Sequence, residues 1–147
     1  MAPAGIRKAL GRYRPFDLAD SWAVQHLAIR DLGDVDLAEL TTNDAVEPIR
    51  KAVAAALPHN DAVILLGGDN SITFPGVLAL DPAGDFGIIT FDAHLDLRAI
   101  GGGLTNATPI RAHLAKGSPG HRSVHSATPS FPNSRSSMAP DPEPGIA

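Results

Sequence analysis

Three side chains that commonly bind metal ions, Asp92, His94 and Asp96, follow a short apolar run at residues 87–91. They stand at alternate positions, and in an extended segment residues i, i+2 and i+4 point to one side. Two carboxylates and one imidazole would then converge, a ligand set that suits Mn²⁺ or Fe²⁺ and also allows Zn²⁺. The spacing therefore predicts a metal site. A polar loop with a solvated Asp96–Arg98 pair is the alternative that the spacing leaves open.

A second polar motif, Gly67-Gly-Asp-Asn-Ser71, follows another apolar run at residues 62–66. Its two glycines permit a tight turn and a close approach of the backbone to a ligand. Asn70 or Ser71 could cap the helix that follows. The motif lacks the glycine patterns of phosphate-binding and dinucleotide-binding loops. Taken alone, it also fits a glycine-rich turn that ends in a helix cap.

The elements that would position both motifs form a strand–helix–strand unit. Residues 62–66 and 86–91 are uncharged apolar runs of strand length. A helix that continues through Val77 to Leu80 joins them, and such a connection makes the two strands parallel. Ligands bind at the carboxyl ends of strands in open α/β sheets. Asn70 and the Asp92 motif are therefore expected at one edge of the sheet.

Three further helices are expected along the chain. The first starts near Pro3 and ends near Gly11. The second has Asn43 as its N-cap and carries an apolar stripe through Leu57. The third is short and begins at Pro109. Alternating strands and helices of this kind predict an α/β layer fold.

Composition excludes several classes of protein. The chain has 147 residues, a formal net charge of −4 and no cysteine. The acidic balance argues against a nucleic-acid surface, which needs a basic stripe. Disulfides and thiolate metal sites are excluded because there is no cysteine. No apolar run approaches the length of a membrane span, so we expect a soluble, cytoplasmic protein that uses neither nucleic acid nor membrane as a partner.

The character of the chain changes at residue 117. Residues 1–116 form the expected α/β domain. Residues 117–147 are rich in serine and proline and have no helical or strand period, which predicts an irregular, disordered tail. His121 and His125 lie in this tail, where we expect solvated side chains.

Three segments together resemble the ureohydrolase family, which includes arginase, agmatinase and formimidoylglutamase. They are Gly67-Gly-Asp-Asn-Ser-Ile-Thr73, Phe91-Asp-Ala-His-Leu-Asp-Leu-Arg98 and Asn106-Ala-Thr-Pro-Ile-Arg111. The Asp-Ala-His-x-Asp sequence is highly specific to that family. The resemblance covers residues 2–116. The Asp-Leu-Arg ending of the second segment and the Thr-Pro-Ile-Arg of the third look most similar to formimidoylglutamase and to the actinobacterial arginase-like branch.

This resemblance implies an incomplete three-layer α/β/α fold with a mostly parallel sheet. It also implies a dinuclear Mn²⁺ site that hydrolyses a small linear amidine or guanidine, in a protein that forms homo-oligomers when complete. By the family pattern, Asp92 bridges both metal ions, His94 binds one and Asp96 the other. Asn70 stands where the family usually has a histidine ligand. Asn106 stands where arginases have a histidine, in a loop that could approach a substrate or equally be a plain flexible loop.

One family motif is missing from the chain. The second metal motif, Asp-x-Asp-x-x-Asp-Pro, is absent, since no Asp-x-Asp occurs after Asp96. The family's first strand also has no counterpart before Met1. We therefore expect a truncated ureohydrolase, with a catalytically inactive fragment or a non-catalytic metal- or small-molecule-binding module as the alternatives.

Overall fold

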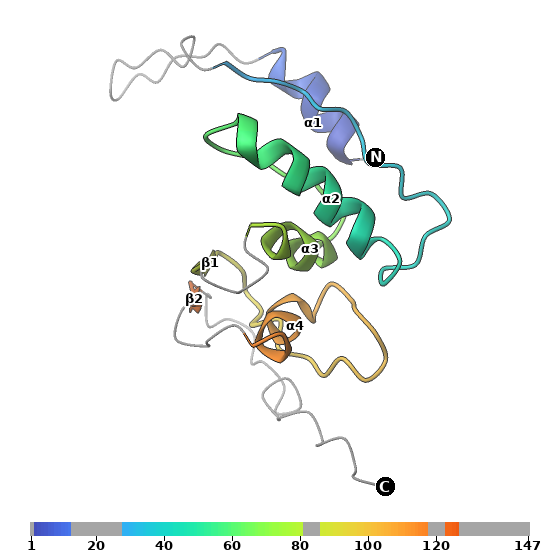
Figure 1. Ribbon diagram of the computed structural model, residues 1–147, viewed down its shortest axis with the longest axis vertical. Coiled ribbons are helices and arrows are strands. Elements are labelled where there is room, and N and C mark those ends of the chain that lie inside the picture. Colours follow the sequence, from blue (N-terminus) through green and yellow to red (C-terminus); the bar gives the residue numbers. More distant parts are fainter. Residues whose placement is uncertain (1, 13–27, 81–85, 118–122, 127–147) are drawn as a thin grey trace, which may run out of the picture.

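The computed structural model describes residues 2–12, 28–80, 86–117 and 123–126. Helices and connecting segments make up most of this part of the chain, and the two strands have three residues each. Helices α2, α3 and α4 follow one another in space, with α3 between the other two, and the strands lie to one side of them (Figure 1). No helix in these described ranges combines the length and the apolar character needed to cross a bilayer.

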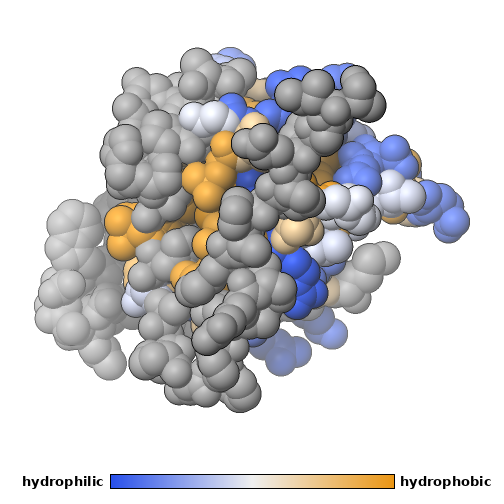
Figure 2. Space-filling model, turned by 90° about the horizontal axis from the view of Figure 1, so that it is seen from below, coloured by the Kyte–Doolittle hydropathy of each residue, from blue (hydrophilic) through white to orange (hydrophobic). Residues whose placement is uncertain are grey.

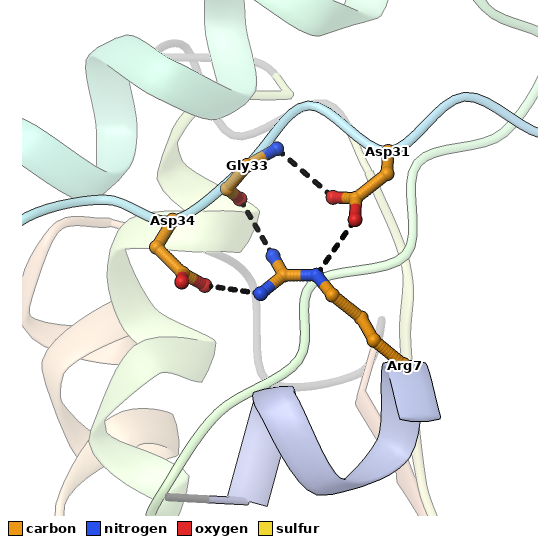
Figure 3. Close-up of polar contacts among 4 residues, drawn as sticks. All are labelled: Arg7, Asp31, Gly33 and Asp34. Carbon is orange, nitrogen blue, oxygen red and sulfur yellow. Dashed lines mark hydrogen bonds and ion pairs between the residues drawn. The ribbon is translucent and has the colours of Figure 1, made fainter. Parts of the chain in front are cut away.

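The first helix, α1 (Ala2–Leu10), is attached through one arginine rather than through a buried face. None of its residues is buried. The guanidinium of Arg7 lies 2.9 Å from a carboxylate oxygen of Asp31 and 2.6 Å from one of Asp34, and it donates to the carbonyl oxygen of Gly33 (Figure 3). The predicted helix is confirmed, and one side chain ties it to residues 31–34.

Helix α2 (Val46–Ala56) carries the hydrophobic core. Ile49 and Val53 are buried and cluster with Ala79, which follows α3. The apolar stripe predicted for this helix therefore faces α3. The turn of 3-10 helix η2 (Leu57–His59) ends this helical segment.

Asn43 is not the N-cap of α2, which corrects the prediction from sequence. The cap residue is Ala45, without a side-chain hydrogen bond. A turn precedes the helix, because Thr41 Oγ1 accepts the N–H of Asp44. Asn43 instead accepts the N–H of Leu104 at 3.0 Å. Its side chain therefore joins this turn to a loop 61 residues away in sequence.

The sheet consists of β1 (Ile88–Thr90) and β2 (Ser123–His125), which run parallel. Ile88, Ile89 and Thr90 pair with Ser123, Val124 and His125, respectively. The strand predicted at residues 86–91 is therefore confirmed in its central part. Its partner was not predicted, since residues 117–147 show no strand period. Apart from Gly117 and Ser126, the rest of that tail, including His121, lies outside the described residues.

Residues 62–66 do not form the predicted strand. They pair with no strand in the described ranges, although their side chains alternate as in extended backbone. Val63 and Leu65 pack against the α2 cluster, whereas Ile64 is 84% exposed. A strand needs a hydrogen-bonded neighbour, and β1 pairs with β2 instead. The predicted strand–helix–strand unit is therefore wrong in its first strand.

Helices α3 (Thr73–Leu78) and α4 (Pro109–Ala115) pack against each other. The 3-10 turn η3 (Asn70–Ile72) leads directly into α3. Helix α4 begins at Pro109, as predicted, because proline is well tolerated in a first turn. The buried residues of α4 include Ile110 and His113, which therefore belong to the face that packs inward.

Candidate functional site

Asp92 and His94 form a tight turn at the carboxyl end of β1. The backbone N–H of His94 donates to Asp92 Oδ1 at 2.9 Å. His94 Nδ1 lies 3.3 Å from the same oxygen. This is the local turn in which an aspartate side chain binds the backbone two residues ahead. The turn brings one carboxylate and one imidazole together in a position open to solvent, since the His94 side chain is 69% exposed.

Asp96 is not part of this pair and makes its contact with another residue. It is buried, with 7% exposure, and its backbone has a φ of 54°. The bend at residues 93–94 and the left-handed backbone at Asp96 interrupt the extended alternation that the spacing predicted. The expectation of an extended backbone that continues past Asp92 is therefore wrong. The predicted metal role of the three side chains is a separate matter and stays a prediction.

Asn70 is the partner of Asp96. Its Nδ2 donates to Asp96 Oδ2 at 2.6 Å and to the backbone oxygen of Asn106 at 3.1 Å. An ionised Asp96 carboxylate and a backbone oxygen can only accept hydrogen bonds. The NH₂ end of the Asn70 amide, and not its oxygen, therefore faces them. Asn70 Oδ1 accepts the hydroxyl of Thr73 at 2.7 Å. The amide of Asn70 thus joins the start of α3 to two loops.

The glycine-rich motif positions Asn70. Asp69, and not Asn70 or Ser71, caps the following 3-10 turn, because its Oδ1 accepts the N–H of Ser71 at 2.7 Å. Gly67 is required by space, since a Cβ atom there would lie 2.1 Å from Cδ1 of Ile72. Gly68 has no such neighbour within 4 Å. The motif is therefore a structural turn with a cap, and it also positions Asn70 next to Asp96.

The residues after Asp96 are held by Arg111 of α4. Its backbone N–H donates to the Asp96 carbonyl at 3.2 Å. Its Nε and Nη2 donate to the Leu97 carbonyl at 3.0 and 2.8 Å. Arg111 belongs to the third segment that resembles the family, and no role was predicted for it from the sequence. A cationic side chain two residues after a helix-starting proline was the available signal.

His113 is a second residue that sequence reasoning missed. It is 1% exposed and lies between Phe74 and Phe86, with ring centroids 4.9 and 5.7 Å away. Among the described residues, neither ring nitrogen finds a hydrogen-bond partner of normal geometry. Burial lowers the pKa of His113, and the nearby backbone of Thr73 offsets part of that effect. Its position on the inward face of α4 could have indicated its burial.

The types of donor group at this position suit a hard divalent cation, but there are fewer donors than such a cation needs. Carboxylate and imidazole groups suit Mn²⁺, which prefers about six ligands. No group of three or more His, Asp or Glu side chains in the described ranges is placed to hold a metal ion. Asp92 and His94 offer two donors, and Asp96 binds Asn70. Among the described residues, Asp92 and His94 are therefore the two donors that lie together at this position.

Comparison with known protein families assigns this chain to one of them. The pattern of the arginase family matches residues 1–141, nearly the whole chain. The chain belongs to the arginase family. The predicted family is thereby confirmed, and the match extends beyond residue 116, where the predicted resemblance ended. Part of the tail thus lies within the family match.

Named relatives of this arginase-family chain are longer proteins. It is 36% identical over 121 residues to the formimidoylglutamase of Halalkalibacterium halodurans, covering 80% of this chain and 38% of that protein. It is 38% identical to the formimidoylglutamase of Halobacterium salinarum, covering 74% and 36%. It is 35% identical to the agmatinase of Pyrococcus horikoshii, covering 65% and 33%. The chain therefore spans about a third of these relatives.

A solved structure supports the same assignment. The formimidoylglutamase of Bacillus subtilis is similar with a TM-score of 0.81 and 28% identity, over 92% of this chain and 44% of that one. The predicted arginase-like α/β fold is confirmed, as a partial fold with few strand residues.

Proposed function

We propose that this chain is the amino-terminal part of a hydrolase that cleaves a C–N bond of a small linear amidine or guanidine. The observation that carries the proposal is the Asp92–His94 contact at the carboxyl end of β1, beside the Asn70–Asp96 contact. This is the sheet edge where α/β proteins bind ligands. Two relatives named formimidoylglutamase favour a formimidoyl amino acid as the substrate, and agmatine is the second choice.

We propose Mn²⁺ as the cofactor, held in part by Asp92, His94 and Asp96. A bound divalent ion would acidify a water molecule for attack on the trigonal amidine carbon. The remaining ligands would come from outside the described residues. Asn70 is the least suited of the predicted ligands, because its oxygen already accepts the hydroxyl of Thr73. Its amide nitrogen cannot bind a cation.

The chain's own residues have distinct tasks in this proposal. The N–H of His94 fixes the Asp92 carboxylate, which leaves the second oxygen of that carboxylate for a ligand. Arg111 holds the loop after Asp96 through the Leu97 carbonyl. Asn106 is the proposed substrate-binding residue, since its side chain is exposed and its backbone contacts Asn70.

A second candidate function is a metal-binding module without turnover. The partial donor set favours it for this chain by itself, because three converging donors are missing from the described ranges. In that case the chain would bind Mn²⁺ weakly and release no amine from any amidine.

Isothermal titration of the purified chain with Mn²⁺ separates these cases. We expect binding that Asp92→Ala and His94→Ala abolish and that Asp61→Ala leaves unchanged, since Asp61 is an exposed carboxylate in another segment. Amine release from N-formimidoyl-L-glutamate and agmatine is then measured with bound Mn²⁺ on this chain joined to the carboxy-terminal part of the Bacillus subtilis formimidoylglutamase, so that the remaining ligands are present. Binding without release supports the module. Binding that Asp92→Ala does not change contradicts the proposed site.

A further inference from the structure

The chain between Asp96 and α4 forms a loop with a closed base. We call residues 98–107 the site loop. The N–H of Arg98 donates to the carbonyl oxygen of Ala107 at 3.1 Å, which joins the two ends of the loop. Next to α4, Thr108 Oγ1 accepts the N–H of Thr105 at 2.8 Å. These contacts hold the base of the loop, whereas the residues at its tip need contacts of their own.

The tip of the site loop is a tight turn. The N–H of Gly103 donates to the carbonyl oxygen of Ile100 at 2.8 Å. Gly103 has a φ of 94°, in the left-handed region that glycine enters without steric cost. Gly101 and Gly102 are exposed, and a Cβ atom on either would meet nothing within 4 Å. The tip therefore has few contacts that could hold it in place.

One side chain from outside the loop holds this tip. Asn43 Oδ1 accepts the N–H of Leu104 at 3.0 Å. A Cβ atom on Gly103 would lie 2.8 Å from Asn43 Nδ2, so the amide of Asn43 lies directly against the turn. In the described part of the chain, no other hydrogen bond reaches residues 99–104 from outside the loop.

Asn43 is itself fixed to the helix that carries the core. In its turn, Thr41 Oγ1 donates to the Asp44 carboxylate at 2.6 Å and accepts the N–H of Asp44 at 3.2 Å. The carbonyl oxygen of Asn43 accepts the N–H of Val46, the first residue of α2, at 3.3 Å. The tip of the site loop is thus attached to a rigid element.

A second asparagine holds the same segment two residues further on. Asn70 Nδ2 donates to the backbone oxygen of Asn106 at 3.1 Å. Asn43 precedes α2 and Asn70 precedes α3, and these two helices pack against each other. Two points of attachment fix the direction of a segment, whereas one point leaves it free to rotate. The direction of the Asn106 side chain therefore depends on both asparagines.

The contact of Asn43 lies on a hydrophilic side of the molecule. Figure 1 shows the loop before α4 and the turn before α2 on the right. Figure 2, seen from below, shows hydrophilic surface mainly on that side. Asn43 and Asn106 are both exposed. Apolar burial thus contributes little here, and the amide of Asn43 provides most of the attachment.

We propose that Asn43 is a positioning residue of the substrate site. It holds the tip of the site loop, and through the loop it holds Asn106 beside the Asn70–Asp96 contact. The inference rests on the proposed function, because it takes Asn106 as the residue that binds the substrate. A loop that is already ordered loses less conformational entropy when a ligand binds. Asn43 therefore increases the affinity for the substrate and leaves the chemical step unchanged.

Hydrogen exchange of this chain, followed by NMR, tests the attachment without turnover. Asn43→Ala is expected to speed exchange of the Leu104 and Ala107 amides about 3- to 10-fold, the effect of losing one hydrogen bond. Asn43→Asp keeps an accepting oxygen, so its exchange should stay close to wild type. Gly102→Ala is the matched control, because Gly102 has open space. Exchange at Ala107 that Asn43→Ala leaves unchanged would overturn the inference.

Steady-state kinetics separate positioning from a merely structural role. The chain joined to the carboxy-terminal part of the Bacillus subtilis formimidoylglutamase is assayed with saturating Mn²⁺ and N-formimidoyl-L-glutamate. We expect Asn43→Ala to raise KM about 3- to 10-fold and to leave kcat within about twofold of wild type. Asn43→Asp should restore KM. A fall in kcat at unchanged KM would overturn the inference.

Failure of the proposed function and failure of this inference give different results. A joined wild-type chain that binds Mn²⁺ and releases no amine counts against the proposed function. Exchange at Leu104 and Ala107 then still decides whether Asn43 holds the site loop. Amine release with a KM that Asn43→Ala does not change counts against this inference alone.

Discussion

The side-chain amide of Asn70 donates a 2.6 Å hydrogen bond to the buried carboxylate of Asp96. The two residues are 26 positions apart, and their contact joins the glycine-rich turn to the loop after β1. A buried carboxylate that loses its donor bears a large part of its desolvation penalty. The contact therefore stabilises the fold as well as the arrangement of the site.

Asn70→Ala is expected to lower the free energy of unfolding by about 1–3 kcal/mol, because the buried Asp96 carboxylate loses the hydrogen bond that Asn70 donates to it. Urea unfolding followed by circular dichroism measures it. Asn106→Ala is the control, because Asn106 takes part only through its backbone oxygen, and it should change stability little. Equal effects of the two substitutions would show that the Asp96 contact contributes nothing specific.

Gly67→Ala is expected to destabilise the chain by about 1–3 kcal/mol, the usual cost of overpacking. The added Cβ would lie 2.1 Å from Ile72 Cδ1, and Ile72 packs against the α2 cluster. Gly68→Ala has open space and should be nearly neutral. Ile72→Val removes the nearest clashing atom, Cδ1, and leaves Cγ1 at 2.9 Å, so the double variant should lose less stability than the two single losses added together. Strict additivity would argue against the clash.

Arg7→Gln is expected to release α1 while the rest of the fold stays intact. The helix has no buried residue, and the Arg7 guanidinium makes its contacts to residues 31–34. Hydrogen exchange followed by mass spectrometry should show faster exchange in residues 2–10 and unchanged exchange in α2. Lys8→Gln on the same helix is the control. High salt should reproduce part of the Arg7→Gln effect, because exposed ion pairs are screened.

Stability is expected to fall as the pH drops below about 6.5, the ordinary pKa range of histidine. Burial lowers the folded-state pKa of His113. The unfolded chain therefore takes up the proton at a higher pH than the folded chain does. Stability decreases from the unfolded-state pKa down to the folded-state pKa and then levels off.

His113→Phe should remove this part of the pH dependence in urea unfolding between pH 8 and pH 5. Phenylalanine keeps the ring between Phe74 and Phe86 and removes the two buried ring nitrogens. His59→Gln, at an exposed position, should leave the slope as it is. A slope that survives His113→Phe would assign the effect to other groups.

Local signals in the sequence predicted several elements correctly. Pro109 marks the start of α4, because its fixed φ suits a first helical turn. The apolar run at residues 86–91 contains β1, and the stripe of α2 faces the core. These features depend on residues close together in sequence, so they could be read without knowing the fold.

The failed predictions depended on contacts between distant segments. Asn43 has the side chain of a helix cap, but it binds Leu104. Residues 62–66 have the composition of a strand, but no strand pairs with them in the described ranges. The pairing of Val124 with Ile89 spans 35 positions, taken as 124 minus 89. Hydrophobic periodicity and secondary-structure propensity do not identify such distant partners.

The candidate site was predicted in composition and only partly in geometry. The spacing of Asp92, His94 and Asp96 placed them correctly after a strand. It assumed extended backbone, whereas a bend and a positive φ separate Asp96 from the other two. The family resemblance gave Asn70 a ligand role, which stays a prediction, and the structure adds the contacts of its amide with Asp96 and Thr73.

The left-handed backbone at Asp96, with a φ of 54°, limits which amino acids can occupy this position during evolution. Glycine, asparagine and aspartate enter this region most readily, and β-branched residues are strained there. Asparagine would keep the turn and still accept the hydrogen bond of Asn70 through its amide oxygen. One substitution could thus remove the negative charge at little cost to folding. Natural variation can therefore remove the negative charge at this position more easily than it can change the shape of the loop.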